Sequence, residues 1–298
     1  MKALFEDSYM AVVMPTLLVR YGELGLKSDS VRSRFEQALV QDIRRKHVLA
    51  GVPCVITSPR GRVFVDSDDW QRSCEILSHT FGVVSFSPVT RVSSDFETMK
   101  QGIRAFAEPL VFEGATFAIR ARRTGNHPYT SQSLGRDLGS VVFTSFIDKN
   151  LKVDLGEPDV EIFVEVRERE AYLHSSRLPG PGGMPKGTQG KVLSIVESER
   201  GLASSWLLMK RGCNVQIATQ NHDLTAPLTA WNPDLKVMDP EDNLFSLAWR
   251  KECSGLAFEW GITELDNRPA PKGDLPVFYP LVGMTSEEVH ALIKRVNA

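Results

Sequence analysis

A segment crowded with proline and glycine, LPGPGGMPKGTQG at 178–190, constrains the fold of this chain more than any other feature. Proline lacks a backbone donor and glycine weakens helices and strands, so regular structure cannot persist where the two alternate. The segment therefore predicts a boundary, and we interpret 179–190 as a stiffened linker. Glycines also let backbone N–H groups approach a phosphate, so a phosphate-binding role for Gly180, Gly182 and Gly183 remains the alternative.

The residues before this linker predict two small α/β domains. The first, 1–90, has the element order β-α-β-β-α-β of a ferredoxin-like domain. Its strands are expected at 16–21, 54–58, 63–66 and 83–89, and its helices at 30–49 and 70–81. The second domain, 91–178, is expected to contain helices at 96–110 and 135–150 and strands at 116–122, 162–166 and 171–174.

The residues after the linker, 191–298, alternate strand and helix. Strands at 192–196 and 215–219 flank a helix at 202–211, and such a β-α-β unit requires parallel strands. Further helices are expected at 245–252 and 286–296, and further strands at 256–260 and 277–281. We therefore expect a Rossmann-like C-terminal domain with a parallel sheet, within a multi-domain fold that combines α+β and α/β architecture.

The distribution of charge separates the front of the chain from its end. The formal net charge is only −2, which excludes binding of polyanions by bulk charge alone. Residues 1–136 hold 18 Lys or Arg against 14 Asp or Glu, whereas the remainder holds 17 against 23. A nucleic-acid site is therefore expected as a local basic patch in the front half.

Cysteines and apolar runs exclude several other classes of protein. The cysteines are scattered singly, which argues against a zinc site or a disulfide framework; they are Cys54, Cys74, Cys213 and Cys253. No stretch approaches the roughly 20 apolar residues of a membrane span, and 1–15 does not resemble a secretory signal. We therefore expect a cytoplasmic protein with no metal site and no membrane partner.

The strongest candidates for RNA contact follow the expected strand at 116–122. Guanidinium groups there precede a Gly-Asn-His-Pro-Tyr loop, so cations, an imidazole and a phenol ring are available to a phosphate backbone and unpaired bases. The candidates are Arg120, Arg122, Arg123, Asn126, His127 and Tyr129. The alternative is a solvated strand end whose arginines pair with the acids of 154–170.

A second, weaker set of candidates lies in the first domain. Lys27 and Arg32 flank the start of the helix at 30–49, and Arg60 and Arg62 lie at the tip of the hairpin expected between its two middle strands. A charged helix face or hairpin tip is also commonly just solvated, so both interpretations remain open.

Several stretches of the sequence resemble the bacterial and archaeal tRNA 4-thiouridine synthetases, or tRNA sulfurtransferases. The resemblance rests on VRYGELGLKS at 19–28, FAIRARRTGNHPYTS at 117–131, KVDLGEPDVEIFVEV at 152–166, GPGGMPKGTQGKV at 180–192, LMKRG at 208–212 and LPVFYPLVGMTSEE at 275–288. It implies a ferredoxin-like domain over 1–90, a THUMP domain over 91–178 and an ATP-pyrophosphatase-like domain over 191–298. It also implies that the first two domains hold the acceptor end of a tRNA, and it is compatible with a homodimer.

The third domain departs from that family at its nucleotide loop. Family members carry Ser-Gly-Gly-x-Asp-Ser directly after the first strand, where the glycines expose N–H groups to a phosphate. This chain lacks the Gly pair and the Asp, and two carboxylates stand where a pyrophosphate needs donors. The corresponding residues are Glu197, Ser198, Glu199, Arg200 and Gly201. We therefore expect a degenerate loop, no catalytic residue and no cofactor.

These observations leave two hypotheses for the function of the protein. The leading hypothesis is a tRNA-binding protein that takes part in tRNA thiolation as a non-catalytic member, or with a separate sulfur-transfer enzyme as its partner. In the family, a sulfur-handling cysteine lies downstream of the segment that 280–296 resembles, and this sequence ends at Ala298. The alternative is an active ATP-dependent tRNA sulfurtransferase with an atypical loop, which requires ATP with Mg²⁺.

Overall fold

The computed structural model describes residues 16–22, 28–59, 61–267 and 273–298. These residues form two compact units. The first comprises 16–18, 64–70 and 87–178, and the second comprises 19–63, 71–86 and 179–298. Each unit combines several separate stretches of the chain, so the units do not correspond to the predicted domains. The predicted domain boundaries therefore stay predictions.

The front of the chain has the predicted element order. It consists of β1 (Thr16–Tyr21), α1 (Asp29–Leu49), β2 (Val55–Thr57), β3 (Val63–Asp66), α2 (Trp70–Ser78) and β4 (Val83–Ser93). The strands neighbour one another in the order β2-β3-β1-β4. Helix α1 begins where the Ser28 hydroxyl accepts a hydrogen bond from the N–H of Val31. It buries Phe35, Leu39 and Ile43, which recur once per turn as the apolar spacing predicts.

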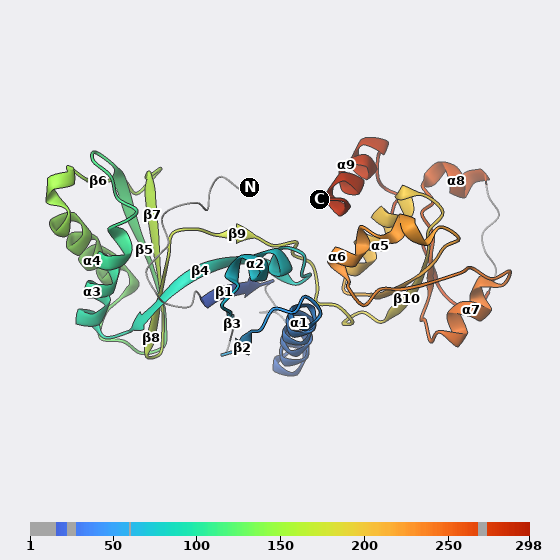
Figure 1. Cartoon of the computed structure of the whole chain (residues 1–298), viewed down its shortest axis with the longest axis horizontal. Helices are drawn as coiled ribbons and strands as arrows, with labels where there is room; N and C mark the ends of the chain where they lie inside the picture. The colour runs from blue at the N-terminus through green and yellow to red at the C-terminus, as the bar shows by residue number, and fades with distance from the viewer. Residues whose placement is uncertain (1–15, 23–27, 60, 268–272) are drawn as a thin grey trace. The chain divides into compact units, whose positions relative to one another are not determined.

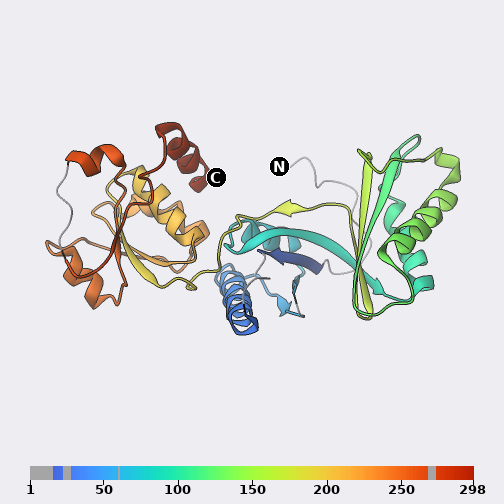
Figure 2. The same ribbon diagram turned by 180° about the vertical axis from the view of Figure 1, so that it is seen from behind.

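The first unit contains a mixed sheet with two helices on one face, as Figures 1 and 2 show from opposite sides. β7 (Val160–Arg167) pairs antiparallel with β8 (Glu170–His174) and parallel with β5 (Thr116–Thr124). Helices α3 (Phe96–Ala107) and α4 (Ser131–Ser145) share one apolar core with these strands. The short elements of this region are η2 (Ile147–Lys149), β6 (Lys152–Val153) and β9 (Leu178–Pro179).

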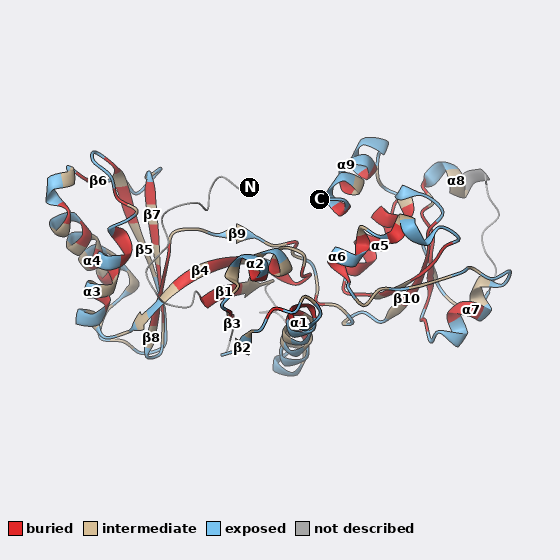
Figure 3. Cartoon of the chain, viewed as in Figure 1, coloured by how far each residue is buried: buried red, intermediate tan, exposed pale blue. Residues whose placement is uncertain are grey.

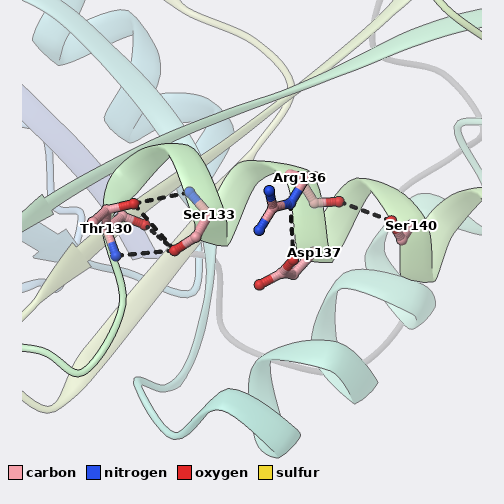
Figure 4. A network of polar contacts seen from close by, with 5 residues as sticks. All are labelled: Thr130, Ser133, Arg136, Asp137 and Ser140. Carbon is pink, nitrogen blue, oxygen red and sulfur yellow. Dashed lines mark hydrogen bonds and ion pairs between the residues drawn. The ribbon is translucent and has the colours of Figure 1, made fainter.

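Helix α4 shows why one expected range was wrong. It spans Ser131–Ser145, whereas the sequence pattern predicted 135–150. The Thr130 hydroxyl accepts a hydrogen bond from the N–H of Ser133 at 3.0 Å, and the Ser133 hydroxyl accepts one from the N–H of Thr130 at 3.0 Å (Figure 4). This reciprocal cap fixes the start of the helix. The short helix η2 follows α4 and ends at Asn150, which adopts the left-handed conformation (φ 51°).

The residues after the linker form the predicted parallel sheet. Its strands are β10 (Lys191–Ile195), β11 (Asn214–Ala218), β12 (Lys236–Met238), β13 (Leu256–Ala257) and β14 (Val277–Phe278), arranged in the order β12-β11-β10-β13-β14. All four pairings are parallel. The other elements are α5 (Glu199–Lys210), η3 (His222–Thr225), α6 (Leu228–Trp231), α7 (Leu244–Arg250), α8 (Ile262–Asn267) and α9 (Ser286–Val296).

Helices cover both faces of this sheet. One apolar core joins α5, α6 and α9 to β10 and β11, and a second joins α7 to the opposite face. Figure 3 shows the difference in burial between α5, which is largely buried, and α4, which exposes its outer side. The sequence pattern missed β12, α6 and α8, since these elements of three to six residues are too short for a periodic signal.

The proline- and glycine-rich segment connects parts of the second unit through its backbone. The N–H of Gly180 donates to the carbonyl of Val84 at 2.9 Å, and that of Gly182 donates to Val83 at 2.8 Å. Gly183 has a positive φ of 78°, and a Cβ there would overlap the carbonyl oxygen of Lys210. These contacts favour the connector interpretation, because the amides of Gly180 and Gly182 are already bonded to protein carbonyls.

Candidate nucleic-acid interface

A groove of about 1130 Å³ in the first unit brings together four arginines from three parts of the chain. Residues of β5 and α4 form most of its lining. We call it the arginine groove, after Arg120, Arg122, Arg136 and Arg177. Glu161 is the one acidic residue in the lining, so cations outnumber acids at this surface.

The groove lies where β5 is only partly covered and where α4 carries glycine at two positions next to that strand. β6 pairs with β5 only at Thr116 and Phe117, which leaves the rest of that edge without a strand partner among the described residues. On α4, a Cβ at Gly135 would lie 3.4 Å from the carbonyl oxygen of Ile119, and one at Gly139 would lie 3.8 Å from Cγ1 of the same residue. Glycine at both positions lets the helix approach the strand and leaves space beside it.

The four arginines differ in how tightly the chain holds them. Arg120 donates through Nε to Oε1 of Glu161 at 2.6 Å and through Nη2 to the carbonyl of Leu155 at 2.6 Å. The guanidinium carbon of Arg177 lies 4.2 Å from the centre of the Phe163 ring, over its face. For Arg120, the ion pair with an acid of 154–170 matches the alternative that the sequence left open.

The other two arginines are available to an incoming anion. Arg122 is exposed on the same face of β5 as Arg120, and its guanidinium has no hydrogen bond or ion pair within the described ranges. The side chain of Arg136 is 76% exposed, with Nε 3.4 Å from Oδ1 of Asp137 (Figure 4). Such an exposed pair between neighbours contributes little stability and competes weakly with a phosphate.

The loop after β5 is not part of the groove lining. Arg123 donates to the carbonyl of Gly125 at 3.0 Å, and a ring nitrogen of His127 lies 3.1 Å from the carbonyl of Thr124. The rings of His127 and Tyr129 stack at 5.4 Å, and the Tyr129 hydroxyl donates to the carbonyl of Ser94 at 2.9 Å. Burial raises the pKa of Tyr129. The expected convergence of imidazole and phenol with all three arginines is therefore not observed.

The remaining predicted RNA contacts are scattered. Arg32 lies in the first turn of α1, 3.5 Å from Asp29, and Arg62 donates to the carbonyl of Gly61 at 2.7 Å. Asn126 is exposed in the loop after β5. None of these three lines the arginine groove. Lys27 and Arg60 lie outside the described residues.

Sequence reasoning missed Arg136, Arg177 and Phe163, which the fold brings to the groove from separate elements. One available signal was the spacing of Gly135 and Gly139, which places both glycines on the same face of α4. The parallel register, in which Arg120 faces Phe163 and Arg122 faces Glu165, is set by tertiary structure and has no local signal.

The expected nucleotide loop of the second unit already binds an anion of the chain itself. The backbone N–H groups of Glu197 and Ser198 donate to Oε2 of Glu259 at 3.0 and 3.1 Å, and the Ser198 hydroxyl donates to Oε1 at 2.6 Å. Ser198 also caps α5 by accepting the N–H of Arg200 at 3.2 Å. As arranged, residues 197–201 do not fit a pyrophosphate, because the donors of Glu197 and Ser198 are already bonded to the carboxylate of Glu259.

The described residues contain no cluster of three or more His, Cys, Asp and Glu side chains suited to a metal ion. The four cysteines are free thiols, and burial raises the pKa of Cys213. Within the ranges that the structure covers, no helix has both the length and the apolar character needed to cross a membrane.

Comparison with known families matches the front half of the chain. A model of the ThiI ferredoxin-like domain matches residues 16–87, and a model of the THUMP domain matches residues 93–175. Among curated proteins, a probable tRNA sulfurtransferase of Methanothermobacter thermautotrophicus is 36% identical over 290 residues, which cover 93% of this chain and 71% of that protein. One from Methanobrevibacter smithii is 38% identical over 75% of this chain and 58% of its own length.

The chain spans about half to three quarters of the length of these curated relatives. Among solved structures, a protein of Pyrococcus horikoshii Ot3 is 27% identical with a TM-score of 0.81, and the match covers 96% of this chain and 100% of that one. A 4-thiouridine synthetase solved with RNA and bound ATP shares the fold, with a TM-score of 0.74 at 20% identity over 95% of this chain and 85% of that chain.

Proposed function

This chain belongs to the tRNA sulfurtransferase family, and from that premise we propose that it binds tRNA and takes part in tRNA thiolation. The observation that carries the proposal is the arginine groove, where Arg122 and Arg136 are exposed beside an uncovered strand edge. Guanidinium groups recognise phosphates with two donors each, which suits a nucleic-acid backbone. The acceptor end of the tRNA, which is single-stranded at its tip, is the proposed substrate region.

The names of the relatives favour sulfur transfer itself over the non-catalytic role expected from the sequence. An ATP-dependent tRNA sulfurtransferase is therefore the first candidate for the activity of the whole protein. In that case the third domain must admit ATP with Mg²⁺ at or near residues 197–201, although the donors there are bonded to Glu259.

The second candidate is a tRNA-holding member that works with a separate sulfur-transfer enzyme. The specific observation in its favour is the occupied loop, where acids stand at 197, 199 and 259 and Arg200 is the basic residue. A protein of this kind requires tRNA affinity but no ATP turnover.

Filter binding to total tRNA tests the shared part of the proposal. We expect salt-dependent binding by the wild-type chain and loss of binding when Arg122 and Arg136 are both replaced by alanine. Calorimetry with ATP, with and without tRNA, then separates the two candidates, together with assay of 4-thiouridine in cells lacking the gene. Absence of tRNA binding by the wild-type chain would contradict both.

A further inference from the structure

Glu259 follows a strand at the place where ligands bind in open parallel sheets. In the strand order β12-β11-β10-β13-β14, the chain proceeds from β10 toward one edge and then returns to place β13 and β14 on the other side. The carboxyl ends of β10 and β13 thus form the topological switch point of the sheet, the usual position of a ligand in an open parallel sheet. Glu197 follows β10 and Glu259 follows β13, and the two segments meet where the N–H of Glu197 donates to the Glu259 carboxylate.

The carboxylate of Glu259 is bound there as a ligand would be. It receives three hydrogen bonds from two backbone N–H groups and one hydroxyl at the start of α5, at 2.6 to 3.1 Å. The residue is only 8% exposed. The start of a 12-residue helix such as α5 favours a negative charge, and phosphates often bind at such a position. The two oxygens of the Glu259 carboxylate lie where two oxygens of a phosphate would be expected to bind.

Gly201 lies directly beside the carboxylate of Glu259. A Cβ at Gly201 would lie 2.5 Å from Oε2 of Glu259 and 2.8 Å from Cα of Val196. Any larger residue at 201 would therefore displace either the carboxylate or the end of β10. Glycine at 201 therefore permits the close approach of the Glu259 carboxylate to the start of α5.

We infer that Glu259 is a built-in anion that closes an oxyanion site at the switch point, and that a diphosphate group enters only by displacing it. The inference assigns to Glu259 the control of phosphate entry into the third domain. It applies to both candidates for the activity: in an ATP-dependent enzyme the carboxylate must move before ATP binds, and in a non-catalytic member it stays in place. It does not depend on tRNA binding by the arginine groove.

Isothermal titration of the full chain with inorganic pyrophosphate tests this inference. Replacing Glu259 by alanine removes the competing anion and frees three donors, so Glu259→Ala should bind pyrophosphate at least about tenfold more tightly than the wild type. Glu259→Gln keeps one oxygen acceptor and the side-chain shape but not the charge, and it should give an intermediate affinity.

Glu264→Gln is the matched control. Glu264 lies 3.8 Å from Arg200 and accepts the N–H of Gly261, but it makes none of the three contacts that hold Glu259. It should bind pyrophosphate as the wild type does. If Glu259→Ala does not fold, the rise in melting temperature caused by pyrophosphate is compared between Glu259→Gln and the wild type and should be larger for the variant.

Two outcomes would overturn the inference. Equal pyrophosphate affinity in the wild type and both Glu259 variants would mean that the carboxylate does not obstruct the site. Absence of pyrophosphate binding in every folded variant would mean that the loop is not an oxyanion site even when vacated. Because the tRNA assays use a different surface, either failure is distinguishable from failure of the proposed function.

Discussion

The arginine groove and the loop at the start of α5 are two sites where a helix begins beside a strand of a sheet, yet they carry opposite charge. The groove presents four arginines and one glutamate, and Arg122 has no partner within the described chain. At the loop, the donors are already held by Glu259, and Glu197 and Glu199 add further acid. On our proposals, affinity for a polyanion therefore lies in the first unit, and the loop can bind one only after the carboxylate of Glu259 moves.

Of the substitutions that test this comparison, those of Arg122 and Arg136 should change tRNA affinity most. We expect Arg122→Ala with Arg136→Ala to weaken tRNA binding by about 100-fold, since each removes a charge-assisted contact to phosphate. Arg104→Ala is the control, because Arg104 is exposed on α3 and does not line the groove. Equal weakening by the control would show that general charge, rather than the groove, determines affinity in filter binding.

A change of pH should alter the stability of the second unit through the buried lysine Lys46 of α1. Burial lowers the pKa of Lys46 from 10.5 to about 8, with Asp42 acting in the opposite direction. The folded chain then binds fewer protons than the unfolded chain between these values. The free energy of unfolding should therefore rise with pH from about 8 to 10.5, by about 2.5 kcal/mol from this residue.

Denaturant titrations of the wild type and Lys46→Met at pH 7 and pH 10 measure this contribution. Buried cysteines with raised pKa values, Cys74 among them, act in the opposite direction at high pH in both proteins. The quantity that tests the prediction is therefore the difference between the two proteins. A difference that does not change with pH would contradict it.

The space in the groove should matter as well as its charge. Gly139→Leu places a side chain beside Ile119, and we expect about tenfold weaker tRNA binding, equivalent to about 1.4 kcal/mol. Gly139→Ala is the matched control, because its Cβ would make an ordinary contact at 3.8 Å with Ile119 and alanine favours helices. If both variants bind tRNA like the wild type, the space beside α4 is not used.

The smallest effect is expected at Arg123. Its side chain donates to the carbonyl of Gly125, and the residue is absent from the groove lining. Arg123→Ala should change tRNA affinity by no more than about twofold, as is usual for exposed charges outside a binding surface. A loss as large as that of Arg122→Ala would extend the interface to the loop after β5.

Much of the fold could be predicted because its signals are local. The apolar spacing at one residue per turn predicted α1. The succession of strand, helix and strand predicted β10, α5 and β11 and the parallel sheet that they begin. The missed strand β12 and helices α6 and α8 are too short to show a period.

The candidate sites could be predicted only in part. Arg120 and Arg122 follow from one strand, whereas Arg136 and Arg177 join them through tertiary packing. Glu259 had no signal at all, since it lies 61 residues from Ser198 in the sequence and meets it only because β10 and β13 are neighbours. Comparison of the loop sequence with the family shows that the glycines are missing. It does not show that the side chain of Glu259 accepts the N–H groups of Glu197 and Ser198.

The salt dependence of tRNA affinity tests the central claim, that the arginine groove holds the RNA backbone, most directly. Each phosphate contact contributes a log-log slope of about −0.7 for single-stranded and −0.9 for duplex nucleic acid. The account predicts that Arg122→Ala with Arg136→Ala reduces the magnitude of the slope by about 1.4 to 1.8 relative to the wild type. An unchanged slope in the double variant would contradict it.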